Sequence, residues 1–217
     1  MRSEIRATDQ NRRSFIEEAR RAQIIECAIE TIAELGYGQA SLARIAKRAE
    51  ISAGVISYYF AGKDELIREV LAHVFAVGGD FIRLRAEGRA DARSTLRAFI
   101  EAGIGFIGER PHYARAAMNI IHAGRAEAGA SWFDPSVLEP RQATIGAILA
   151  WGQREGEFRA FSAPVMVATI IEALDAVPPQ LAVQPDLDLQ AYAAELADLF
   201  ELATRRSQSP PSRGAGQ

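Results

Sequence analysis

Apolar residues recur at helical spacing along almost the whole chain. Within residues 13–35, apolar residues recur at spacings of three and four positions, as on one face of a helix: Ile25, Ala28, Ile29, Ile32 and Leu35. Strand-like alternation of apolar and polar residues is hard to find elsewhere. The pattern therefore predicts an all-α fold.

Capping residues, glycines and prolines divide the remaining pattern into further helices. Ser41 is the expected N-cap of a short helix that ends near Ala49, and a second short helix follows from about 53 to 59. A longer helix begins at Lys63, although two adjacent glycines weaken its middle. The remaining helices are expected over about 91–109, 111–123, 134–156, 164–177 and 188–205, with loops at 124–131 and 180–185.

Charge and composition narrow the possible functions. The 217-residue chain has a formal net charge of −3, so any DNA binding has to come from a local patch. Its single cysteine, Cys27, excludes an intrachain disulfide, fits a reducing cytoplasm and is interpreted as a small buried hydrophobe. We see no signal peptide and no apolar run near the roughly 20 residues of a membrane span. A cytoplasmic protein without membrane contact is expected.

Residues 36–66 have the pattern of two short helices joined by a tight turn. The first has an apolar face around Ala46, a residue small enough to let two helices cross closely, and the second has a complementary face around Ile56. This is the layout of a helix-turn-helix. A helical hairpin with a solvated basic face is the competing interpretation. The basic residues share one face of the first helix because of their spacing: Arg44, Lys47 and Arg48.

The second short helix consists mainly of small and hydroxyl-bearing residues. Small residues at the start of a recognition helix let its backbone approach base edges in the major groove. Hydroxyl groups suit phosphate oxygens. Lys63 can meet a phosphate through its own charge and through the helix N-terminus on which it lies. The small and hydroxyl-bearing residues are Ser52, Ala53, Gly54, Ser57, Tyr58 and Tyr59.

The same stretch resembles the signature of the TetR family of repressors. The resemblance covers roughly residues 15–70 and keeps the family's order and spacing after a long first helix. Residues 54–60 look most like the branch that includes the betaine-responsive repressor of choline metabolism. The matching residues are Ser41, Leu42, Ile45, Ala46, Ile51, Ser52, Gly54, Ile56, Tyr58, Tyr59, Phe60, Lys63 and Leu66.

The resemblance implies a role for each DNA-binding residue. Ser41 would contact a phosphate at the start of the first short helix, and Phe60 would belong to the core. Other residues would grip the DNA backbone, namely Tyr58, Tyr59 and Lys63. Those at or near the groove would be Ser52, Ala53, Gly54 and Val55. Arg44 and Ser57 complete the predicted set.

Two positions depart from the family pattern. Glu50 stands where the family usually has a turn glycine, so a left-handed backbone there would carry about 1 kcal/mol of strain and place an acid near DNA. Ser57 stands where many members have tyrosine, which changes the contact expected at that point. The arginines of residues 1–13 either enter the minor groove or belong to a solvated tail.

The second half of the chain contains motifs that mimic other functions. Residues 103–108 read GIGFIG and fit a dinucleotide fingerprint, but they lie inside a helical pattern rather than after a strand. The three histidines are scattered without metal-ligand spacing, and no nucleophile elbow or P-loop is present. No cofactor and no metal are therefore expected. An enzyme is kept as an alternative, with isolated acids such as Glu101 or Glu172 as its best candidates.

The resemblance further implies a helical effector pocket in this half. An acid such as Glu101 would help a cationic effector bind, and each pocket candidate has core packing as its competing interpretation. The last two helices, around residues 165–174 and 192–202, are the expected dimer interface, with an intrachain core as the alternative. The pocket candidates are Phe99, Phe106, Met118, Ile121, His122, Trp132, Trp151 and Thr169.

These observations predict a one-component transcriptional regulator. Residues 1–12 form a flexible arm, 13–62 a three-helix helix-turn-helix domain, 63–205 a helical effector-binding and dimerisation domain, and 206–217 a disordered tail. The expected partners are an operator in double-stranded DNA, a small-molecule effector and a second copy of the chain. A repressor is the main hypothesis, and a DNA-binding activator or architectural protein is the alternative.

Overall fold

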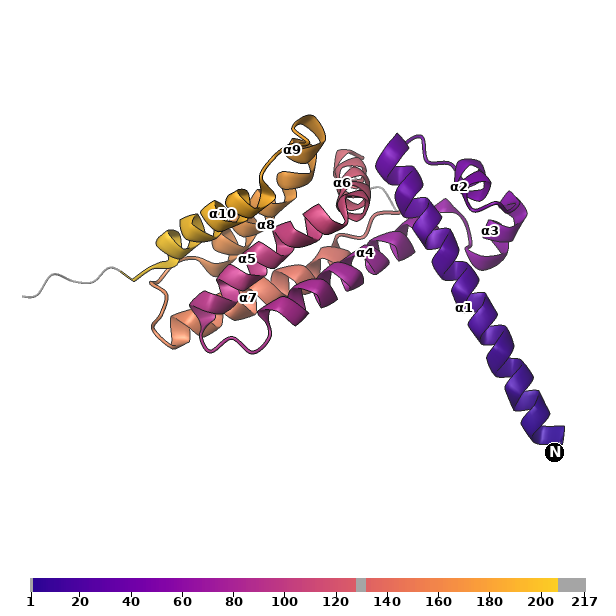
Figure 1. Cartoon of the computed structure of the whole chain (residues 1–217), viewed down its shortest axis with the longest axis horizontal. Helices are drawn as coiled ribbons and strands as arrows, with labels where there is room; N and C mark the ends of the chain where they lie inside the picture. The colour runs from indigo at the N-terminus through magenta and orange to yellow at the C-terminus, as the bar shows by residue number, and fades with distance from the viewer. Residues whose placement is uncertain (1, 128–131, 207–217) are drawn as a thin grey trace, which may run out of the picture. The chain divides into compact units, whose positions relative to one another are not determined.

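A computed structural model describes residues 2–127 and 132–206, with side chains from residue 15 onward. The described residues are helical throughout, apart from turns and one isolated bridge between Phe158 and Arg205, so the all-α prediction is confirmed. The α-helices are labelled in Figure 1. The elements are α1 (Arg2–Leu35), α2 (Leu42–Arg48), α3 (Ala53–Tyr59), α4 (Lys63–Ala86), α5 (Ala92–Glu109), α6 (Pro111–Ala126), η1 (Pro135–Leu138), α7 (Glu139–Arg154), α8 (Ala163–Asp175), α9 (Val177–Val183) and α10 (Leu189–Thr204).

The chain divides into two compact units. The first contains the residues up to Gly79 together with Phe106–Leu138, and the second contains Asp80–Gly105 and the residues from Glu139 onward. Helices α4 and α5 therefore each contribute to both units. The domain boundaries predicted from the sequence stay predictions, because compact units are defined by contacts and not by function.

The first unit is organised around α1. Most of the apolar face predicted for this helix is buried, with Ala28, Ile29 and Ile32 fully enclosed, whereas Leu35 at the end of the helix is 39% exposed. Helix α2 packs on α1, and α3 packs on α2 (Figure 1). Helix α6 also packs against α1, where the side-chain amide of Asn119 donates a hydrogen bond of 3.0 Å to the carbonyl of Ile32.

Helix α1 differs from its expected length. It begins at Arg2, so the segment that was expected to be a flexible arm continues the helix. Residues 2–12 contain no glycine or proline. Helix propagation from an established segment adds one hydrogen bond for each residue, whereas nucleation is unfavourable. A buried helix therefore extends into a neighbouring polar segment that contains no helix breaker.

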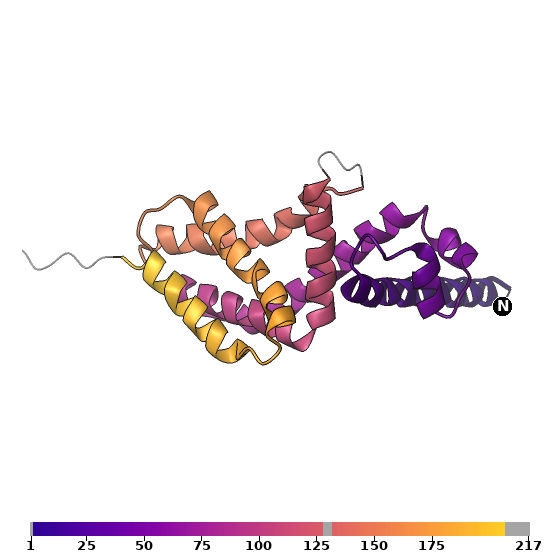
Figure 2. The ribbon, with the colours of Figure 1, turned by 90° about the horizontal axis from the view of Figure 1, so that it is seen from above.

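Ion pairs connect the helices of the second unit. Arg97 of α5 binds Asp198 and Glu201 of α10, and Arg141 of α7 binds Asp175 of α8 at 2.6 Å. Figure 2 shows α7 beside α8 and α5 beside α10. Arg141 and Asp175 are both mostly buried. Charges removed from water need a well-formed hydrogen bond to offset the lost hydration, which this pair provides.

The prolines of the second unit correct one expected boundary. We expected a helix to end before Pro178 and a loop to follow, but these prolines lie in the first turn of α9. Proline is tolerated there because the first backbone N–H groups of a helix have no partner within the helix. A break at Ala176 separates α8 from α9.

The same segment corrects the expectation about apolar runs. Residues Ala163–Val183 together are long and apolar enough to cross a membrane by length and composition, and a third of the best window is buried inside the protein. The break at Ala176 leaves α8 with 13 residues, fewer than the roughly 20 that a spanning helix needs. We therefore interpret the segment as two helices of this unit. The tail expected at 207–217 and part of the loop expected at 124–131 lie outside the described residues.

Two glycines of α7 test the packing of the second unit. A Cβ atom at Gly152 would overlap the ring of Phe158, which is 4% exposed, whereas a Cβ at Gly146 would make only an ordinary contact with Val167 at 3.9 Å. We expect Gly152→Ala to lower the free energy of unfolding by about 1–3 kcal/mol through overpacking. The control Gly146→Ala should raise it by up to about 1 kcal/mol because alanine has the higher helix propensity. Urea denaturation of both variants measures the difference, and equal stabilities would contradict the packing described.

Candidate DNA-binding surface

Helix α2 begins and packs as predicted. The Ser41 hydroxyl accepts a hydrogen bond from the backbone N–H of Arg44 at 3.3 Å, which caps the helix. Ile45 and Ala46 are buried, so the apolar face of α2 is turned toward the protein. The backbone carbonyl of Ser41 receives the first helical hydrogen bond, from the N–H of Ile45 at 3.0 Å.

Helix α3 presents its small and hydroxyl-bearing residues outward. Ile56 is fully buried and Phe60, just after the helix, is 2% exposed, so these two side chains attach α3 to the unit. Tyr58 is 74% exposed, and Val55 and Tyr59 are half-buried. The other exposed members of the predicted DNA-binding set on this helix are Ser52, Ala53, Gly54 and Ser57.

The basic residues of α2 do not all face solvent. Arg48 is half-buried and pairs with Glu30 at 3.0 Å and with Glu34, both on α1. Its hydrogen bond holds the pKa of the Glu34 carboxyl below the ordinary value. Lys47 is exposed, and Arg44 donates to the carbonyl of Gln39 at 2.9 Å. Arg48 thus serves the α1–α2 contact, and the exposed charge of this helix is smaller than its sequence suggests.

The turn between α2 and α3 has the conformation expected of a glycine. Glu50 has a φ of +55° and is the non-glycine residue of the described chain in the left-handed region. Its side chain is exposed. Glu50 therefore adopts the left-handed conformation, and we expect a residue with a Cβ to carry about 1 kcal/mol of strain there.

Arg21 of α1 holds the end of α3 and was not identified from the sequence. Its guanidinium donates to the backbone carbonyl of Tyr59 at 2.5 Å and lies 4.4 Å from the ring centroid of Phe60. It also approaches Glu69 at 3.5 Å and Glu65 at 4.0 Å. A cation at the C-terminal end of a helix is favourable because the last carbonyls lack helical partners. Arg21 and Tyr59 are 38 positions apart in the sequence, which explains why no local motif reveals this contact.

Lys63 lies at the first position of α4 and has a partner within the protein. Its ammonium group donates to the carbonyl of Tyr37 at 2.9 Å and lies 4.1 Å from the centre of the Tyr37 ring. Burial lowers the pKa of Lys63. An ammonium group has three N–H donors, of which Tyr37 receives one, so this contact is compatible with a phosphate contact.

The predicted pocket residues are spread over both units. In the first unit, Trp132 stacks on Tyr37 with ring centroids 4.4 Å apart, and His122 is exposed. The other candidates in this unit, Phe106, Met118 and Ile121, are buried. In the second unit Phe99 is buried, Trp151 is half-buried and Thr169 is exposed, its hydroxyl bonded to the carbonyl of Val165 within α8.

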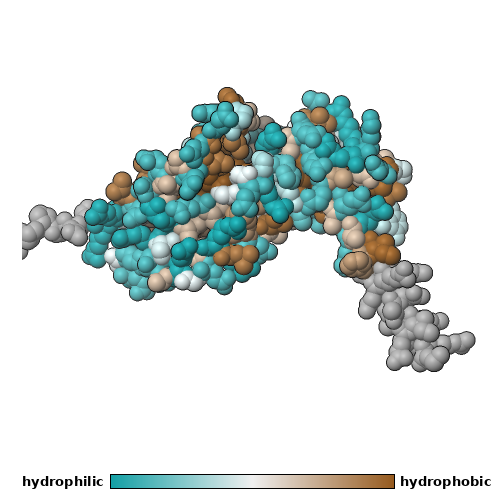
Figure 3. Space-filling view, in the orientation of Figure 1, coloured by the Kyte–Doolittle hydropathy of each residue, from teal (hydrophilic) through white to brown (hydrophobic). Residues whose placement is uncertain are grey.

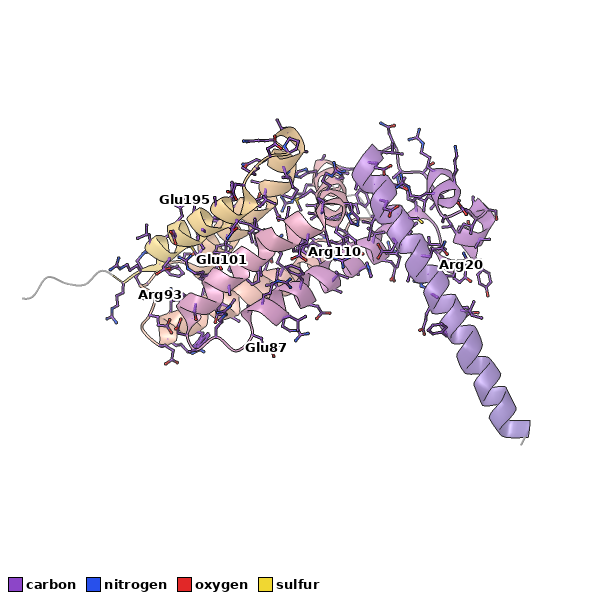
Figure 4. The ribbon with its side chains drawn as sticks, in the orientation of Figure 1. Arg20, Glu87, Arg93, Glu101, Arg110 and Glu195 are labelled. Carbon is purple, nitrogen blue, oxygen red and sulfur yellow. The ribbon has the colours of Figure 1, made fainter. Side chains whose placement is uncertain are left out.

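Glu101, the acid proposed for a cationic effector, is already paired. It lies on α5 (Figure 4), where its carboxylate accepts a hydrogen bond from Arg97 at 3.3 Å. It borders a shallow surface depression whose other lining residues include Arg85 and Arg89. Two cations beside the carboxylate disfavour a cationic ligand there. The GIGFIG motif lies inside α5, in the helical setting expected for it and not at the strand-to-helix turn of a dinucleotide fingerprint.

Taken together, these features define the class of protein. A capped short helix, a tight turn and a second short helix with an exposed face form a helix-turn-helix, which is a DNA-binding unit. Residues 24–70 match the family described as bacterial regulatory proteins, tetR family. This part of the chain, which contains the helix-turn-helix, is therefore similar to the DNA-binding domain of TetR-family regulators.

Known relatives match different parts of the chain. The regulator BetI 1 of Chromohalobacter salexigens is 45% identical over 83 residues, which are 38% of this chain and 41% of that protein. A TetR-family regulator from Marinobacter aquaeolei aligns with a TM-score of 0.74 at 16% identity, covering 89% of this chain and 100% of that one. FadR from Bacillus subtilis, solved in complex with stearoyl-CoA, aligns with a TM-score of 0.72 at 22% identity, covering 82% and 96%. The two structures share the fold of this protein.

The strained turn leads to a prediction about stability and DNA affinity. Replacing Glu50 by glycine should raise the free energy of unfolding by about 1 kcal/mol, because glycine adopts a positive φ without a Cβ clash. It should also tighten binding to any duplex, since a negative charge beside the DNA is removed. Glu50→Gln is the matched control, because it removes the charge and keeps the strain. Equal unfolding free energies for the glycine and glutamine variants would contradict the strain at this position.

Proposed function

We propose that this protein is a sequence-specific DNA-binding transcriptional regulator, acting in the cytoplasm as a repressor that a small-molecule effector releases. The observation that carries the proposal is the exposed face of α3, where small and hydroxyl-bearing residues stand out from a buried anchor at Ile56 and Phe60. Backbone that carries only small side chains can approach base edges closely in the major groove.

The residues of this surface have distinct proposed roles. Ser52, Ala53, Gly54 and Val55 lie at the N-terminal end of α3 and meet the groove. Tyr58, Tyr59 and Lys63 contact the DNA backbone, together with Ser41 and Arg44 at the start of α2. Backbone contacts set the register of the protein, and groove contacts distinguish sequences. Ser57 bonds its own helix backbone at 3.3 Å, and its shorter side chain alters the contact that a tyrosine would make.

A homodimer places two such helices on one palindromic operator. The proposed interface is the outer face of α8 and α10, where Val165, Leu199 and Leu202 are 65%, 55% and 64% exposed. Figure 3 shows hydrophobic residues on the surface where α8 and α9 lie. Ile171 and Phe200 of the same helices are buried in the chain itself. We therefore assign the buried faces of α8 and α10 to the core of the chain, and their exposed faces to contact with the second copy in the dimer.

The likeness to BetI supports the operator-binding half of the proposal. It covers 83 residues, about two-fifths of each chain, whereas the structural likeness to FadR covers most of both chains. The effector is proposed to bind the helices beyond residue 63. Effector binding changes the affinity of the dimer for its operator only if the effector has different affinities for the two conformations of the dimer.

The first test is selection of duplexes from a random pool with the purified protein. We expect enrichment of a palindrome, and Lys63→Ala should lower affinity for it and reduce the salt dependence by about one phosphate contact. Tyr59→Ala should weaken binding and leave the salt dependence nearly unchanged, because tyrosine is neutral. If no duplex sequence is enriched from the pool, the proposal is contradicted. In vitro transcription from a promoter carrying the selected site separates a repressor from an activator.

The second test concerns the dimer. Leu202→Glu should convert the dimer to monomers at micromolar concentration, because it places a charge in an apolar interface. Leu84→Glu is the control, since Leu84 is similarly exposed at 66% but lies on α4 outside the proposed interface. Analytical ultracentrifugation measures both. Dissociation of both variants, or of neither, would exclude the α8–α10 face as the interface.

A further inference from the structure

The segment that follows α6 contacts the helix-turn-helix through one aromatic stack. The rings of Trp132 and Tyr37 are nearly parallel, with centroids 4.4 Å apart and an interplanar angle of 16°. Trp132 is 8% exposed, and its indole N–H donates to the Glu127 carboxylate at 3.2 Å. Tyr37 lies in the turn between α1 and α2, immediately before the DNA-binding surface. Trp132 and Tyr37 belong to the same compact unit.

Neighbouring contacts hold Trp132 in this place. The ring of Phe133 packs edge-on against Trp132 and occupies the space where a Cβ at Gly124 would be. Gly124 lies in the last turns of α6, and α6 is bonded to α1 through Asn119. The position of Trp132 is therefore set by the end of α6.

Tyr37 also contacts Lys63. The ammonium group of Lys63 bonds the Tyr37 carbonyl at 2.9 Å and lies 4.1 Å from the ring that Trp132 supports. We propose that Trp132 is a positioning residue, which by holding Tyr37 sets the place of Lys63 on the DNA-binding surface and so makes DNA affinity depend on the end of α6. The inference rests on the proposed DNA-binding function. It assigns to Trp132 a role in regulating that site, whereas the sequence pointed to an effector pocket.

The arrangement can be tested without DNA because the chain has only two lysines, Lys47 and Lys63. In protein labelled with ¹³C-lysine, the side-chain signals of Lys63 should be shifted upfield by the Tyr37 ring, with the exposed Lys47 as internal reference. Trp132→Ala should move the Lys63 signals toward those of Lys47, and Trp132→Phe should keep most of the shift. Trp151→Phe, at the other tryptophan of the chain, is the matched control and should leave both lysines unchanged. Unchanged Lys63 signals in a folded Trp132→Ala protein would overturn the proposal.

The role in DNA binding is tested with the palindrome enriched from the random pool. Trp132→Ala should weaken binding about three- to tenfold, the range expected for loss of an aromatic stack, and should reduce the salt dependence by no more than the one phosphate contact that Lys63→Ala removes. In the Lys63→Ala background the same change should have less than about a twofold effect, since the contact it positions is gone.

The outcomes separate the two proposals. A full loss from Trp132→Ala in both backgrounds would show a general structural effect and overturn the positioning role, while the enriched palindrome would leave the DNA-binding function standing. Retention of affinity by Trp132→Phe distinguishes an aromatic support from a specific indole contact. A pool from which no duplex is enriched overturns both the DNA-binding function and the role of Trp132 in it.

Discussion

The packing of α3 onto the rest of its unit is the constraint on which the DNA-binding surface depends. A helix of seven residues is too short to be stable by itself in water, so its conformation has to come from tertiary contacts. Ile56 and Phe60 supply the buried apolar contact, and Arg21 bonds the last carbonyl of the helix. The exposed side chains of α3 do not contribute to the core. Their small size therefore reflects what the exposed face meets and not what the core requires.

Charge acts locally in this protein. The net charge is −3, and the cations near the helix-turn-helix divide between structural and exposed roles. Arg48 and Arg21 form ion pairs with glutamates of α1 and α4, which neutralise their charge and orient α2 and α3. Lys47 remains exposed, while Lys63 is half-buried against Tyr37. Among the cations of α2 and the start of α4, Arg44, Lys47 and Lys63 are therefore the ones left to attract phosphate, and the hydroxyl and backbone donors of α2 and α3 add to their contacts.

Helix α6 belongs to the first unit together with the three N-terminal helices, and it leads the chain on toward the second unit. It packs against α1, and the residues after it return to the turn before α2 through Trp132 and Tyr37. The chain runs from this point through η1 into α7. An element that is bonded to the DNA-binding helices and continuous with the second unit is the kind of element through which two sites become coupled, provided that it has two arrangements of different ligand affinity.

By itself, the sequence determined the features that depend on neighbouring residues. Helical periodicity, the Ser41 cap and the small residues of α3 are local, and they were sufficient for the all-α fold, the bounds of α2 and α3 and the left-handed turn at Glu50. The tertiary structure decided the roles of side chains whose partners are distant in the chain. Arg21 at the end of α3, Arg48 on α1 and Trp132 on Tyr37 each meet a group more than ten residues away. Such pairings depend on how helices pack together, which the spacing of residues within one helix does not record.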